Sequence, residues 1–136
     1  MFDKIKNDIK NDILGKKYDL SIALVTEKKS REINKKYRNK DKATNILSFA
    51  LHKNVGELIL CPNVIKKETK KFGRTYYDLL GFLVIHGMLH LKGLEHSSTM
   101  EKLEEKYDTK YFGGNRRGNF HNQSRSGRIH QRRKKS

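Results

Sequence analysis

Cysteine and proline are almost absent from this 136-residue chain, which has one of each, Cys61 and Pro62. A single cysteine excludes an intrachain disulfide framework and a metal site made of several cysteines. The longest apolar run, Leu79 to Ile85, is far shorter than the ~20 residues that a membrane-spanning helix needs. The charged, periodic N-terminus also lacks the apolar core of a secretory signal. These absences predict a soluble, cytoplasmic protein that is not inserted in a membrane.

Acidic residues are absent from one long segment of the chain. Residues 113–136 contain eight Lys or Arg and no Asp or Glu, together with many Gly, Ser and Asn. This composition predicts one folded domain over residues 1–112, followed by a basic, disordered tail over residues 113–136. We interpret the tail as a nonspecific tether to RNA or to the ribosome. The alternatives are a solubilising tail and an artificial extension.

Basic residues are abundant throughout the chain and give it a formal net charge of +16. Without the tail, the chain still has 23 basic and 15 acidic residues, so the body and the tail each carry about half of the net positive charge. Such a charge favours an anionic partner, for which RNA, DNA and acidic membrane surfaces are the candidates. Charge alone does not choose among them, and a merely solvated basic surface is the simplest alternative.

Hydrophobic spacing predicts helices and a small sheet in a single α+β domain. The expected elements begin with a helix ending near Gly15, a strand over 18–25 and a helix after Thr26. A polar loop over 38–44 and a hairpin of strands 46–51 and 56–60 follow. The chain then forms a helix from Pro62 to about residue 71, a helix that begins at Thr75 and Asp78 and stops at Gly93, and a last helix that begins at Ser98 with Glu101. The helix before Gly93 is apolar on nearly every face, which is typical of a buried central helix.

Three histidines with metal-ligand spacing lie at the C-terminal end of this buried helix, in the string HGMLHLKGLEH of residues 86–96. His86 and His90 are four residues apart, so they project from one face of the helix. Gly93 lets the chain turn back, which allows His96 to become a third ligand. Three histidines leave one tetrahedral position open for water, as in a catalytic zinc site. The spacing therefore predicts one zinc ion, whereas His52, His121 and His130 have no such spacing.

The same spacing matches the extended zinc-protease pattern H-E-x-x-H-x-x-G-x-x-H, but Gly87 replaces the glutamate that serves as the general base. This replacement argues against peptide hydrolysis. Glycine inside a buried helix costs about 1 kcal/mol relative to alanine, so it must bring some gain. Close helix packing and room for a substrate are both compatible with the sequence.

At these residues the chain closely resembles the YbeY family of zinc-dependent endoribonucleases. The family pattern H-G-x-L-H-L-x-G-x-D-H is present at 86–96, with Glu95 in place of the aspartate. A second family segment, N-x-x-Y-R followed by T-D-V-L-S-F-P, is matched by residues 34–38 and by TNILSFA from Thr44. A third, G-D-I-x-I, appears at 56–60 as GELIL. Asn45 and Ala50 depart from the usual aspartate and proline.

The resemblance implies an endoribonuclease that cuts single-stranded RNA, takes part in 16S ribosomal RNA maturation and ribosome quality control, and works with the ribosome or its small subunit. It also implies a mixed four-stranded sheet packed with about five helices. The family arginine corresponds to Arg38, which would bind the phosphate through paired hydrogen bonds. Glu95 is the nearest acidic candidate for catalysis, although a role in orienting a histidine is the simpler interpretation.

Two other functions are compatible with the residues. One is a noncatalytic, zinc-stabilised RNA-binding factor for ribosome assembly, which would explain the charge and the missing glutamate. The other is a zinc hydrolase of peptide or amide substrates, against which the missing glutamate and the basic surface both argue. Neither the oligomeric state nor the attacking group, water or the ribose 2′-hydroxyl, can be read from the sequence.

Overall fold

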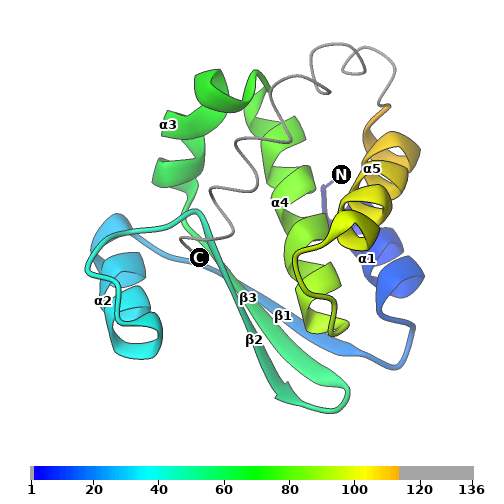
Figure 1. The fold of residues 1–136 in the computed structure, drawn as a ribbon, viewed down its shortest axis with the longest axis horizontal. Helices are drawn as coiled ribbons and strands as arrows, with labels where there is room; N and C mark the ends of the chain where they lie inside the picture. The colour runs from blue at the N-terminus through cyan, green and yellow to red at the C-terminus, as the bar shows by residue number, and fades with distance from the viewer. Residues whose placement is uncertain (1, 114–136) are drawn as a thin grey trace.

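Five helices and three strands make up the part of the chain that the computed structural model describes, residues 2–113 (Figure 1). In chain order they are α1 (Phe2–Ile13), β1 (Asp19–Leu24), α2 (Glu27–Arg38), β2 (Ile46–His52), β3 (Val55–Leu60), α3 (Pro62–Phe72), α4 (Tyr76–Leu91) and α5 (Ser98–Phe112). This is the α+β architecture that the sequence predicts. The predicted tail lies outside the described residues from residue 114 onward.

The sheet has the strand order β1-β3-β2, in which β1 runs parallel and β2 antiparallel to β3. The expectation of four strands is therefore wrong for the described residues. The segment before β1 forms helix α1 because Ile5, Ile9 and Ile13 recur every four residues, which suits one face of a helix and not of a strand. Both β1 and β2 are consequently outer strands of the described sheet.

Helix α4 lies at the centre of the helical layer and packs on the sheet, with α1, α3 and α5 around it (Figure 1). Most of its residues are buried, as its continuous apolar sequence predicts. Gly81 brings α5 close, because a Cβ at this position would lie only 2.1–2.6 Å from ring atoms of Phe112. No helix in residues 2–113 combines the length and the apolar character needed to cross a bilayer.

Helix α2 lies on the other side of the strands from α1, α4 and α5 (Figure 1). Its Tyr37 ring packs edge-on against Phe49 of β2, with the ring centroids 5.4 Å apart. Neighbouring residues of a strand point to opposite faces. Ser48 faces α4, where its hydroxyl lies 3.5 Å from the carbonyl oxygen of Gly87, so Phe49 belongs to the α2 face.

The helix starts follow the cap residues that the sequence suggests, with one difference. Thr26 and Thr75 each accept a hydrogen bond from the backbone N–H three residues on, and so cap α2 and α4. The last helix begins at Ser98, as expected, but its N-cap is the preceding Ser97, whose hydroxyl accepts from the backbone N–H of Met100 at 3.2 Å. Two adjacent serines offer the same cap chemistry, and only the backbone geometry selects between them.

Candidate metal centre

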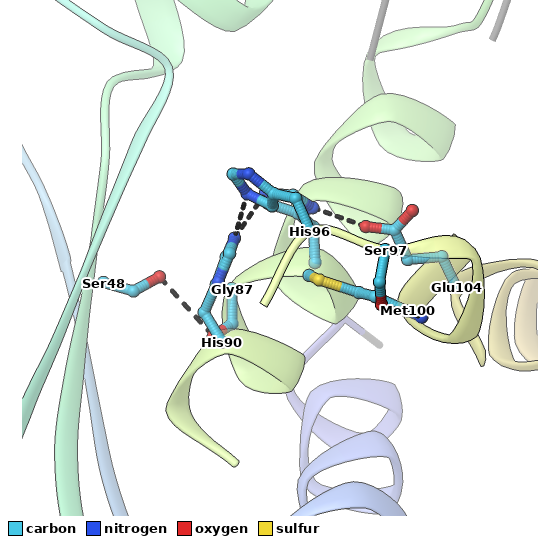
Figure 2. A network of polar contacts seen from close by, with 8 residues as sticks. Ser48, Gly87, His90, His96, Ser97, Met100 and Glu104 are labelled. Atoms are coloured by element: carbon cyan, nitrogen blue, oxygen red, sulfur yellow. Dashed lines mark hydrogen bonds and ion pairs between the residues drawn. The ribbon is translucent and has the colours of Figure 1, made fainter. Parts of the chain in front are cut away.

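The three predicted histidines meet at one point beside the C-terminal end of α4 (Figure 2). His86 and His90 belong to the helix, and His96 lies in the loop between α4 and α5. The turn between them passes through Gly93, whose φ of +104° is a conformation that residues with a side chain rarely adopt. Nε2 of His90 lies 3.1 Å from Nε2 of His86 and 2.8 Å from Nε2 of His96.

These distances suit a bound cation better than a network of hydrogen bonds. Nε2 of His90 can carry only one hydrogen, so it cannot donate to both neighbouring Nε2 atoms. Tetrahedral zinc with Zn–N bonds of about 2.0–2.1 Å places two ligand nitrogens roughly 3.3 Å apart, close to the separations between these rings. The nitrogens of all three side chains lie within 4.8 Å of one another, so the donor set fits one metal ion.

Burial keeps His90 neutral. Burial lowers the pKa of His90 to about 4, with smaller contributions in the same direction from the neighbouring rings of His86 and His96. Only neutral imidazole has a lone pair for a metal, so this lowered pKa leaves His90 competent as a ligand at neutral pH.

Glu104 of α5 is the partner of His86, and sequence reasoning missed it. Its carboxylate is fully buried and accepts a hydrogen bond from Nδ1 of His86 at 2.5 Å (Figure 2). This contact fixes the tautomer of His86, because a proton on Nδ1 leaves the Nε2 lone pair facing the other two rings. A signal was present in the sequence: Glu104 lies four residues from Met100, on the face of α5 that packs on α4.

A buried ion pair holds the same face of α5 one turn further along. Asp108 accepts hydrogen bonds from both terminal nitrogens of Arg74, at 3.3 and 3.2 Å, and both side chains are almost fully buried. The guanidinium carbon of Arg74 also lies 4.5 Å from the ring centre of Phe82. Both buried carboxylates of α5 therefore have a partner: Glu104 contacts His86 of α4, and Asp108 contacts Arg74 in the turn before α4. Together these contacts position Glu104 beside His86.

Close packing accounts for Gly87, one of the two explanations that the sequence left open. A Cβ on Gly87 would lie 2.7 Å from Cδ2 of Leu58 and 2.9 Å from Cδ1 of Ile46, both in the core. Glycine at this position lets α4 approach the sheet directly between the two ligand positions. The glutamate of a zinc protease would not fit here unless the buried side chains of Leu58 and Ile46 moved.

The other residues singled out in the sequence are not members of the histidine cluster. Arg38 is exposed at the last residue of α2, on a different element from all three rings. Glu95 is exposed in the loop next to His96, and it is Glu104 that contacts His86. His52 is exposed at the end of β2, whereas His121 and His130 lie outside the described residues.

Asn45, which replaces a family aspartate, has a structural partner in this chain. Its side chain is buried, and its amide nitrogen donates to the Glu68 carboxylate on α3 at 2.9 Å. An aspartate at this position would bring a second negative charge against Glu68. The amide and the glutamate therefore form a matched pair that links the start of β2 to α3.

The chain is similar in sequence to several known proteins that share one name. The family model described as Endoribonuclease YbeY matches residues 1–111, further toward the N-terminus than the motifs indicate. The chain is 36% identical over 98 residues to the Endoribonuclease YbeY of Staphylococcus carnosus, a match that covers 63% of this chain and 64% of that protein. It is 40% identical over 94 residues to the Colwellia psychrerythraea protein of the same name, covering 64% and 61%. The matches thus span less than two thirds of these relatives.

A solved structure has a similar fold. The fold is similar to the solution structure of a Thermotoga maritima protein, with a TM-score of 0.60 and 29% identity, over 85% of this chain and 87% of that one. The family match covers the strands, the central helix and all three histidines. This chain therefore belongs to the family of the endoribonuclease YbeY.

Proposed function

We propose that this chain is a zinc-dependent endoribonuclease that cuts single-stranded RNA in the cytoplasm. Its proposed place is ribosomal RNA processing, including 16S maturation, and ribosome quality control, with the ribosome or its small subunit as the particle that it acts on. Membership of the family supports RNA as the substrate, and the net charge of +16 suits a polyanion.

One observation carries the proposal: three histidine Nε2 atoms converge while a buried carboxylate orients one of the rings. Three protein nitrogens leave a coordination position for a reactant, which a closed structural site would not. Imidazole ligands suit zinc among the common divalent metals, and His86, His90 and His96 would hold it. When bound, zinc supplies Lewis-acid activation of water or of a phosphoryl oxygen.

The remaining residues would position the RNA and move protons. The guanidinium of Arg38 offers paired hydrogen bonds to a phosphate group and balances the negative charge that gathers on it during cleavage. Glu95, exposed beside His96, is the proposed proton acceptor at the cut. Glu104 is already engaged with His86 and acts by holding that ring. The basic residues of 114–136 would add RNA affinity that weakens with salt.

The decisive experiment is cleavage of an end-labelled single-stranded RNA by the purified protein of known zinc content, with His90→Ala prepared in parallel. Cutting by the wild type alone is the expected result. Equal cutting by both preparations would show a contaminating nuclease. RNA binding without cutting, on free RNA and on small subunits alike, would replace the proposal by a noncatalytic assembly factor.

A further inference from the structure

An exposed aromatic pair lies at the end of α2, away from the histidines. Tyr37 is 60% exposed although its ring packs edge-on against Phe49, with centroids 5.4 Å apart. The ammonium group of Lys36 lies 5.2 Å from the centre of the tyrosine ring. A large ring that is held by a neighbouring ring and is still mostly exposed can receive another flat ring.

The residues around Tyr37 are strongly basic. The segment 35–42, KKYRNKDK, holds five Lys or Arg and a single acidic residue, Asp41. That carboxylate is already paired with Arg31, which donates to its two oxygens at 2.6 and 3.2 Å. The local excess of positive charge attracts a partner with regularly spaced negative charges, such as a nucleic acid strand.

Buried side chains of α2 hold this basic segment in one conformation. Asn34 donates from its side-chain nitrogen to the carbonyl oxygen of Lys42 at 2.9 Å, and the Ser30 hydroxyl contacts both the backbone N–H and the carbonyl oxygen of Thr44. Asn39 ends the helix in the left-handed conformation with φ of 59°. A loop that is fixed before binding loses little entropy when a ligand docks.

The position of β2 connects this pair with the histidines. Within the described residues β2 is an outer strand, paired on one side with β3. Its Ser48 lies on the face of α4 and the metal centre (Figure 2), and the next residue, Phe49, lies on the face of Tyr37. A flexible single strand that passes around the outer edge of β2 can therefore contact both places, whereas a stiff duplex cannot follow this bend.

We propose that Tyr37, supported by Phe49, is a stacking platform for one base of single-stranded RNA, whose phosphates are bound by the basic segment 35–42. This inference rests on the proposed function and adds a reason for the preference for single strands. The platform discriminates by shape, since only an unpaired base exposes its flat face to a protein ring.

The test compares binding of a fluorescent single-stranded RNA with binding of a duplex of equal length, in EDTA so that cleavage does not intervene. Tyr37→Ala is expected to weaken single-strand binding by about 5- to 100-fold, the range for loss of one stacked base, while duplex binding changes little. Tyr37→Phe should bind like the wild type. Tyr77→Ala is the matched control, because Tyr77 is similarly exposed, at 67%, at the opposite end of α4 from the histidines.

A spectroscopic measurement reports stacking directly. The chain contains no tryptophan, so Tyr37→Trp introduces a single indole whose emission nucleobases should quench on binding. Unchanged single-strand affinity of Tyr37→Ala, equal weakening for single strand and duplex, or no quenching would each overturn the platform. Cleavage assays on the same proteins separate the two proposals: a wild type that binds through Tyr37 without ever cutting RNA refutes the nuclease and leaves the platform standing.

Discussion

The metal centre and the basic segment 35–42 are built in opposite ways. Two of the three histidines, His86 and His90, sit on the most buried helix, and the carboxylate that orients His86 is fully buried. The basic segment lies on an outer helix and its loop, with exposed charges and an exposed ring at Tyr37. Burial keeps His90 neutral, while exposure leaves the cations and the flat ring of the basic segment available to a large polyanion. The difference separates the residues that would hold zinc from those that would contact RNA, among which Arg38 would act on the phosphate that is cut.

The largest effect among the tests of this comparison is expected on the cleavage rate when Arg38 is replaced. Arg38→Ala should lower the cleavage rate by about 100- to 1,000-fold, as expected for the loss of a group that stabilises transition-state charge. Zinc content should stay at that of the wild type, because Arg38 lies on a different element from the histidines. Single-turnover cleavage and metal analysis on the same preparation measure both quantities. Loss of zinc from this variant, or full activity, would contradict the proposed division.

Replacement of Glu104 should instead weaken zinc binding, which Arg38→Ala is expected to leave unchanged. Glu104→Gln removes the buried carboxylate from Nδ1 of His86 and should weaken zinc binding by about 10- to 100-fold, with RNA affinity unchanged. Competition with a fluorescent zinc chelator measures the metal affinity, and anisotropy measures RNA binding. Glu105→Gln is the matched control, since Glu105 is the exposed neighbour on α5. Equal zinc affinity in the two variants would remove Glu104 from the metal centre.

A smaller effect is expected where the loop after α2 joins the sheet. Asn45→Asp places a buried carboxylate against Glu68 and should lower the free energy of unfolding by about 1–3 kcal/mol at neutral pH. Adding Glu68→Gln should restore most of the loss, because one amide and one carboxylate then face each other again. Urea denaturation of the four proteins of this cycle gives the coupling energy, and additive effects would show that the two side chains act independently.

The smallest effect concerns acid stability of the metal-free protein. His90 takes up a proton near pH 6.5 in the unfolded chain, whereas burial lowers its pKa in the folded state to about 4. Acid therefore favours unfolding between these values: the contribution is fully present above pH 6.5 and is lost as the pH falls to about 4. Urea midpoints in EDTA should decline less steeply across this window for His90→Gln. Equal slopes would show that the burial of His90 does not govern this response.

Much of the fold could be predicted because local chemistry agrees with it. Thr26, Thr75 and Pro62 mark helix starts, and the apolar residues of α4 predict its burial. Apolar spacing also predicted three strands close to their observed places, whereas the fourth strand was implied only by the resemblance.

Some residues of the candidate site could be predicted from the sequence, and others could not. The i, i+4 pair His86 and His90 and the turn at Gly93 place the ligands together by local geometry alone. Glu104 is 18 positions from His86 in sequence, so only the packing of α5 on α4 brings them together. The partnership of Tyr37 with Phe49 likewise depends on how α2 crosses β2. Residues joined by tertiary packing have no spacing rule that a single sequence reveals.

The central claim is that one zinc ion on His86, His90 and His96 makes this chain a nuclease. The most direct test is stepwise addition of zinc to EDTA-treated protein, with bound zinc and cleavage of single-stranded RNA measured on the same samples. Cleavage should rise in proportion to bound zinc and level off at about one ion per chain. Full cleavage by the zinc-free protein, or no cleavage once the three histidines are occupied and RNA or the small subunit is bound, would contradict it.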